Sequence, residues 1–341
     1  MIEDKNPIEE LERRIKKMME EKQTKEYWDD DIALEDIEVM EDKDDMEEDM
    51  EIEEDLDPTS LKAIHLECKR TENELYYPIP TGFRKLDDIL GGGLRKGNLY
   101  IFGGKPGIGK STFCIQMMYQ LMKQKNNVIY ATAEMKARDI YFKLTHLAYV
   151  FNQRKEFELN SIVPILKELM NRKFEDEKHK EAKKVYDEST NNFINEFKSN
   201  IVYTKKTEEV EDVVKKYPNS ILIIDYLQKM EPKKICQSDK QKVDEILEDL
   251  NELKGTYDVP IIAISSLNRS GYDREDKLAF FKESGGIEYD ATGVFSLTKD
   301  EEDLNNKKLK IKCEKNRFDF GNTIVEFELK FYPKYELLED I

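Results

Sequence analysis

Cysteine and histidine are scarce in this chain of 341 residues, which contains four cysteines and three histidines. The cysteines form no Cys-x-x-Cys pair, and the cysteines and histidines are scattered along the chain, so the sequence predicts no zinc site and no disulfide framework. No apolar run reaches membrane-spanning length, and the acidic N-terminus lacks the apolar core of a signal peptide. We therefore expect a reduced, cytoplasmic protein that does not interact with membranes.

An excess of basic residues is also missing, and the formal net charge is −18. Residues 1–57 hold 26 of the 73 acidic residues and 8 of the 55 basic residues, so this segment carries the entire net charge. The remainder of the chain is neutral. The low isoelectric point of 4.9 therefore does not exclude binding of nucleic acid outside the acidic segment.

The composition divides the chain into three parts. Residues 1–57 are acidic and of low complexity, and we expect them to be largely disordered apart from a short amphipathic helix around Ile8, Leu11 and Ile15. This extension is interpreted either as a solvating tail or as a segment that competes with DNA or docks a basic partner, such as a replication protein. Residues 58–80 form a linker with a predicted helix at 61–69, and residues 81–341 form the organised domain.

Apolar strands alternate with amphipathic helices throughout this domain. Continuous apolar strands of this kind predict an α/β fold with a mostly parallel central sheet flanked by helices. From Gly293 onward, apolar and polar residues alternate, as they do in antiparallel strands. The predicted strands are 99–102, 128–132, 201–203, 221–225, 260–265, 294–297, 309–313 and 323–331, and the predicted helices are 113–123, 139–200, 208–216 and 243–257.

The strongest motif matches the phosphate-binding pattern G-x-x-x-x-G-K-[S/T] between a predicted strand and a predicted helix. Its residues are Gly104, Lys105, Pro106, Gly107, Ile108, Gly109, Lys110, Ser111 and Thr112. Backbone N–H groups and the helix N-terminus would surround a triphosphate, as in ATP or GTP. Lys110 would contact the β- and γ-phosphates, and the Ser111 hydroxyl would bind Mg²⁺.

Two carboxylates end neighbouring predicted strands. Asp225 closes the strand 221–225 and is the candidate second ligand position for Mg²⁺. Glu134 follows the strand 128–132 and could polarise the water that attacks the γ-phosphate. Alternative interpretations are a turn aspartate and a glutamate in the first turn of a helix.

Six motifs in unbroken order between about residues 78 and 335 resemble RecA-fold P-loop NTPases, and most closely the ATPase domain of DnaB-like replicative helicases. They are Thr81-Gly82-Phe83 with Gly91-Gly92-Gly93-Leu94, Ala133-Glu134-Met135, Asp225-Tyr226-Leu227-Gln228, Ser265-Ser266-Leu267-Asn268-Arg269, Glu283 to Asp290, and Lys315-Asn316-Arg317 with Gly321.

The resemblance implies a homo-hexameric ring that binds ATP and Mg²⁺ between subunits and moves on single-stranded DNA during replication. Lys315 and Arg317 would then act in trans on the neighbour's γ-phosphate. Candidate DNA-contacting segments are Lys229–Lys242 and Asn268–Lys282, which contain several lysines and arginines.

Three departures from the family pattern accompany this resemblance. Ser266 replaces the glutamine that senses the γ-phosphate, Lys282 replaces an arginine, and the acidic extension stands where the family has a helical collar domain. Docking of primase or a loader through that collar is therefore not expected. Two further hypotheses stay open: a RadA- or KaiC-type ATPase in repair or regulation, and a nucleotide-gated accessory module without motor activity.

Overall fold

The computed structural model describes residues 60–62, 64–65, 77–154, 177–266, 286–299, 308–318 and 326–341. Contacts divide the chain into two units, residues 1–66 and 67–341. In the first unit, the Ile64 amide donates to the Ser60 carbonyl at 3.0 Å, which forms one turn within the predicted helix 61–69. The helix predicted around Ile8 lies outside the described residues. All elements below belong to the second unit.

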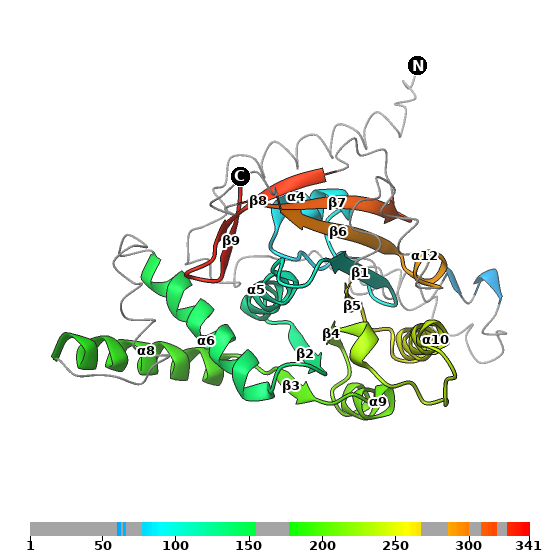
Figure 1. The fold of residues 1–341 in the computed structure, drawn as a ribbon, viewed down its shortest axis with the longest axis horizontal. Coiled ribbons are helices and arrows are strands. Elements are labelled where there is room, and N and C mark those ends of the chain that lie inside the picture. The colour runs from blue at the N-terminus through cyan, green and yellow to red at the C-terminus, as the bar shows by residue number, and fades with distance from the viewer. Residues whose placement is uncertain are drawn as a thin grey trace, which may run out of the picture. The chain divides into compact units, whose positions relative to one another are not determined.

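A nine-stranded sheet organises this unit, in the order β3-β2-β4-β5-β1-β6-β7-β8-β9 (Figure 1). The strands β1 to β6 pair in parallel and β6 to β9 pair in antiparallel fashion, so the predicted α/β class with C-terminal antiparallel strands is confirmed. The strands are β1 Leu99–Gly104, β2 Asn127–Thr132, β3 Asn200–Tyr203, β4 Ser220–Asp225, β5 Ile261–Ser266, β6 Gly293–Lys299, β7 Lys308–Asn316, β8 Glu326–Tyr332 and β9 Leu337–Asp340.

Helices cover both faces of the sheet, which explains why the central strands are apolar on both sides. The helices are α4 Arg84–Ile89, α5 Lys110–Lys123, α6 Ala137–Arg154, α8 Glu177–Glu196, α9 Thr207–Lys216, α10 Asp239–Tyr257 and α12 Ile287–Asp290, with the 3-10 turn η2 at Leu227–Lys229. One buried cluster joins α4, α5 and α6 to alternate strand residues such as Tyr130 and Ile223. The other joins α9, α10 and α12 to the intervening residues, such as Ala131 and Leu222.

Several predicted boundaries differ from the observed ones. The helical region predicted over 139–200 contains α6 and α8 but extends too far at its C-terminal end, because α8 ends at Glu196 and Asn200 already belongs to β3. Residues 155–176 of this region lie outside the described residues. Helix α10 begins at Asp239, four residues earlier than predicted, because the Ser238 hydroxyl caps it by accepting from the Gln241 amide at 3.2 Å. Strand β9 was not predicted.

The Thr81-Gly82 segment of the first motif has a structural role in this fold. The Asp87 carboxylate accepts hydrogen bonds from the Thr81 amide at 2.7 Å, from the Thr81 hydroxyl at 2.7 Å and from the Gly82 amide at 3.2 Å. Burial raises the pKa of Asp87 to about 7 against the effect of these donors. The motif therefore fixes the turn by which the chain enters α4.

Parallel register aligns the carboxyl ends of four central strands at one edge of the sheet. Thr132 is paired with Asp225, and Gly104 at the end of β1 is paired with Ser266 at the end of β5. Ligand sites of open α/β sheets lie outside this edge. The fold thereby brings the predicted phosphate loop and both predicted carboxylates to one place.

Candidate functional site

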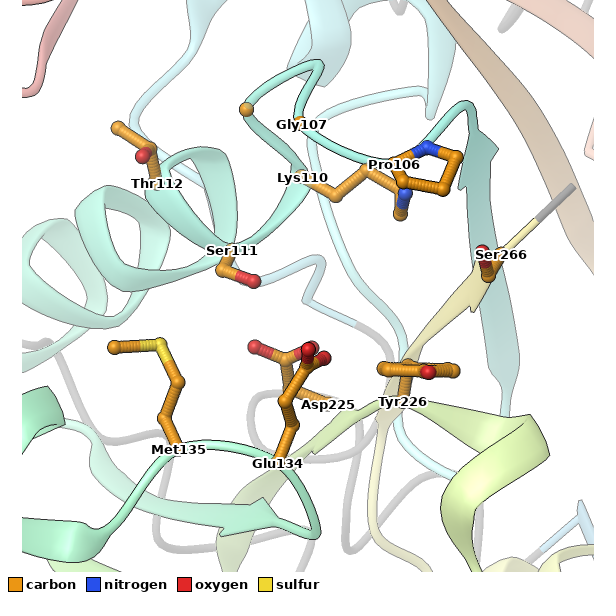
Figure 2. Close-up of a pocket in the computed structure, with 11 residues that line it drawn as sticks. Pro106, Gly107, Lys110, Ser111, Thr112, Glu134, Met135, Asp225, Tyr226 and Ser266 are labelled. Carbon is orange, nitrogen blue, oxygen red and sulfur yellow. The ribbon is translucent and has the colours of Figure 1, made fainter.

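A cavity of about 340 Å³ opens at this edge of the sheet (Figure 2). Its wall consists of the loop after β1 with the first residues of α5, the turn after β2, and the ends of β4 and β5. The lining residues are Pro106, Gly107, Gly109, Lys110, Ser111, Thr112, Glu134, Met135, Asp225, Tyr226 and Ser266. Of the predicted site residues, Gly104, Lys105, Ile108, Lys315 and Arg317 do not line it.

The loop from Pro106 to Gly109 leads directly into helix α5, which begins at Lys110. Gly107 and Gly109 have φ angles of 75° and 108°, a backbone region that residues with a Cβ rarely adopt. The loop therefore turns sharply at the helix N-terminus, where backbone N–H groups and the helix dipole favour a bound anion. Ile108 instead packs into the core.

The Lys110 side chain is buried against its own loop. Its ammonium donates hydrogen bonds to the carbonyl oxygens of Gly104 at 2.7 Å and Lys105 at 2.9 Å. Burial lowers the pKa of Lys110, and the nearby carboxylates of Asp225 and Glu134 oppose that effect. The ammonium must turn away from these carbonyls to contact a phosphate in the cavity.

Asp225 is almost fully buried at the end of β4 and points into the cavity (Figure 2). The hydroxyl of Tyr130, on the neighbouring strand β2, donates to the Asp225 carboxylate at 2.8 Å. Tyr130 was not among the predicted site residues. Strand 128–132 is a continuous apolar run that does not indicate this contact, because the contact depends on the pairing of β2 with β4.

Glu134 is exposed to the cavity in the turn between β2 and α6 (Figure 2). The Thr132 hydroxyl organises this turn: it accepts from the amide of Met135 at 3.1 Å and from that of Glu134 at 3.4 Å, and it donates to the Met135 carbonyl. Such local side-chain bonds hold a tight turn without a regular helix. Glu134 is thus held opposite the Ser111 side of the cavity.

The hard oxygen donors in the cavity match the chemistry of a magnesium–triphosphate complex. Mg²⁺ is usually bound through one or two protein oxygens together with phosphate oxygens and water. Ser111 offers a hydroxyl and Asp225 a carboxylate, while Lys110 offers a cation for phosphate. The residues present therefore fit both the nucleotide and the metal.

Lys315 and Arg317 lie at the opposite edge of the sheet. Lys315 pairs with Val294 and Asn316 with Gly293, which in turn pairs with Tyr100 at the beginning of β1. The Lys315 ammonium donates to the Ala291 carbonyl at 2.7 Å, and the Arg317 guanidinium donates to the Tyr289 carbonyl. The backbone of Asn316, between these two residues, is therefore about 13 Å along the strand direction from the end of β1.

The model of the DnaB-like helicase C terminal domain matches residues 78–340, which is more than half of the chain. The chain belongs to this family. The DnaB-like domain extends to within one residue of the C-terminus and includes every element from α4 to β9.

Individual relatives agree with this family. The replicative DNA helicase DnaB of Helicobacter pylori strain 26695 is 29% identical over 230 residues, which are 64% of this chain and 43% of that protein. The chain thus spans less than half of that relative's length. A match to the DNA repair protein RadA of Synechocystis, 40% identical, covers only 20% of this chain and 13% of that protein, so the RadA-type alternative is not favoured.

A solved structure of a DnaB-like replicative helicase supports the same fold. It superposes on this chain with a TM-score of 0.64 at 23% identity, over 87% of this chain and 70% of that chain. The sheet and its flanking helices therefore have the same fold as that helicase.

In this DnaB-like domain, Gln228 contacts the strand end at which Ser266 replaces the family's glutamine. The Gln228 side chain crosses to the end of β5, where its amide donates to the Ser265 hydroxyl at 2.8 Å and its carbonyl accepts from the Ser266 amide at 3.0 Å. Ser266 lines the cavity. Gln228 therefore joins the end of β5 to the turn η2 that begins the predicted DNA-contacting segment.

Two lysines of the segment Lys229–Lys242 are already engaged in ion pairs. Lys233 lies 2.7 Å from Glu211, and Lys234 lies 2.9 Å from Glu245. These acceptors raise the pKa of both lysines. A phosphate backbone would have to displace these partners, whereas Lys229 and Lys240 are exposed. The segment Asn268–Lys282 and Gly321 lie outside the described residues.

In the part of the chain that the structure describes, no helix combines the length and the hydropathy needed to cross a lipid bilayer.

Proposed function

We propose that this chain is an ATP-hydrolysing motor of the DnaB type, which assembles as a hexameric ring and moves along single-stranded DNA in replication. The observation that carries the proposal is the separation of two half-sites. The phosphate loop, Glu134 and Asp225 share one cavity, whereas Lys315 and Arg317 lie at the far edge of the same sheet. A complete site then requires two subunits arranged head to tail, as in a ring.

Each side chain has a distinct task in this proposal. The loop amides and Lys110 bind the phosphates of ATP, while Ser111 and Asp225 hold Mg²⁺ and its water. Mg²⁺, when bound, neutralises charge on the β- and γ-phosphates. Glu134 orients the attacking water and accepts its proton. Lys315 and Arg317 of the adjacent subunit stabilise the negative charge that develops on the transferred phosphoryl group.

The acidic extension, residues 1–57, is proposed to bind a basic replication partner or to compete with DNA. Its concentrated negative charge would attract a basic partner, and it would equally occupy basic residues that otherwise bind DNA. Deletion of residues 1–57 separates the two roles. A rise in DNA affinity supports competition, whereas an unchanged affinity excludes it and leaves partner binding.

Steady-state ATP hydrolysis with and without single-stranded DNA tests the proposed function. We expect DNA to stimulate the wild type, and Glu134→Gln to lower turnover by at least about 100-fold, because a general base contributes about that much. Glu208→Gln, which alters an exposed glutamate at the beginning of α9, is the matched control and should leave turnover unchanged. Hydrolysis that ignores DNA would contradict the motor and favour a nucleotide-gated accessory module.

A further inference from the structure

Tyr130 belongs to none of the recognised motifs, yet its side chain contacts Asp225, the predicted metal ligand. It lies in the middle of β2 and is fully buried. Its hydroxyl donates to the Asp225 carboxylate at 2.8 Å. Burial is the main cause that raises the pKa of Tyr130 well above its ordinary value, so the hydroxyl keeps its proton and remains a donor.

The register of the sheet explains how this contact forms. Tyr130 pairs with Ile223 of β4, and Asp225 stands two residues beyond Ile223 on the same face of that strand. The phenol ring is long enough to reach along the sheet from Tyr130 to the level of Thr132, which pairs with Asp225. A shorter side chain at this position would leave one oxygen of a buried carboxylate without this donor.

The contact defines how the two carboxylate oxygens are used. With Tyr130 bonded to Oδ2, the other oxygen, Oδ1, is left to accept from a metal-bound water in the cavity that Asp225 lines. Partners of this kind orient ligating groups, and their removal typically lowers metal affinity by about 10- to 100-fold.

We propose that Tyr130 is a positioning residue, which fixes the rotation of the Asp225 carboxylate and thereby sets the affinity of the site for Mg²⁺ in the presence of nucleotide. This inference rests on the proposed function, because it assumes that the cavity binds a magnesium–nucleotide complex. Tyr130 touches neither nucleotide nor metal in this role. Its effect passes entirely through Asp225.

The test measures binding of a fluorescent ATP analogue to the full chain while Mg²⁺ is titrated, and needs no hydrolysis. We expect Tyr130→Phe to raise the half-saturating Mg²⁺ concentration by about 10-fold or more. Analogue affinity measured in excess chelator should be unchanged, because the phosphate loop is intact. Phenylalanine keeps the ring, so the packing of β2 against α5 is retained.

Tyr100→Phe is the matched control. Tyr100 is also fully buried on a central strand, and its hydroxyl accepts from the Arg95 amide at 2.9 Å, away from the cavity. A purely structural effect of losing a buried hydroxyl would appear equally in both variants. Equal Mg²⁺ curves for Tyr130→Phe and the wild type, or equal shifts in both variants, would overturn the inference.

A double variant tests whether the effect passes through the carboxylate. In an Asp225→Asn background, removal of the Tyr130 hydroxyl should not raise the half-saturating Mg²⁺ concentration any further, and a further 10-fold rise would contradict the proposal. A wild type that binds no nucleotide at any Mg²⁺ concentration would refute the proposed function itself. The two failures are therefore distinguishable.

Discussion

Mixing two inactive variants should restore ATP hydrolysis if the site is shared between subunits. Lys110→Ala removes the phosphate-binding cation but keeps Arg317, whereas Arg317→Ala keeps the cavity but loses the trans cation. Each alone should be nearly inactive, since an arginine at this position contributes about 10³-fold or more to turnover. The backbone of Asn316 is about 13 Å along the strands and about 10 Å across two strand spacings from Gly104, so Arg317 cannot complete its own subunit's site.

The magnitude of the recovery follows from random assembly. In an equimolar mixture, about a quarter of the head-to-tail interfaces combine an intact cavity with an intact arginine, so turnover should reach up to about a quarter of the wild-type value. The assay is steady-state phosphate release after subunit exchange, which co-purification of differently tagged subunits verifies. Lys110→Ala mixed with Asp225→Asn is the control and should stay inactive. No recovery in the first mixture despite verified exchange would refute the shared site.

Three further outcomes follow from the described contacts. Burial lowers the pKa of His146 to about 4. Between pH 6.5 and 4, His146 is therefore protonated in the unfolded state but neutral in the folded state. The wild type should therefore lose about 3 kcal/mol of stability relative to His146→Leu between pH 6.5 and 4, as measured by denaturant unfolding. The Gln116 side-chain amide donates to the Leu338 carbonyl at 2.6 Å and accepts from the Leu338 amide at 2.7 Å. Gln116→Leu should therefore lower the free energy of unfolding by about 3 kcal/mol. A shift in thermal midpoint no larger than that of a surface variant would contradict this. Thr132→Val should lower kcat by about 10-fold and leave the KM for ATP unchanged, because it releases the turn that holds Glu134; a changed KM with constant kcat would contradict that role.

The residues that line the cavity were largely predictable from local sequence. A phosphate loop between a strand and a helix, and carboxylates that end apolar strands, both depend on short-range patterns. Parallel strands then bring these segments to one edge whatever their order. That is why Lys110, Ser111, Glu134 and Asp225 were found without knowledge of the sheet.

The residues that support the cavity depend on register between distant strands. The contact of Tyr130 with Asp225 requires β2 to lie beside β4, and that of Gln228 with Ser266 requires the turn η2 to lie against β5. No local pattern contains this information. Strand β9 was missed for a related reason, because its two leucines are adjacent and show no alternation, and it is held by pairing with β8 and by Gln116.

The most direct test of the central proposal is displacement of a labelled strand from a forked DNA duplex by the full chain. We expect displacement that requires hydrolysable ATP and Mg²⁺ and is lost in Glu134→Gln, because movement along one strand depends on repeated hydrolysis at the shared sites. DNA-stimulated ATP hydrolysis without any displacement, with subunits assembled and bound to the fork, would contradict the helicase motor.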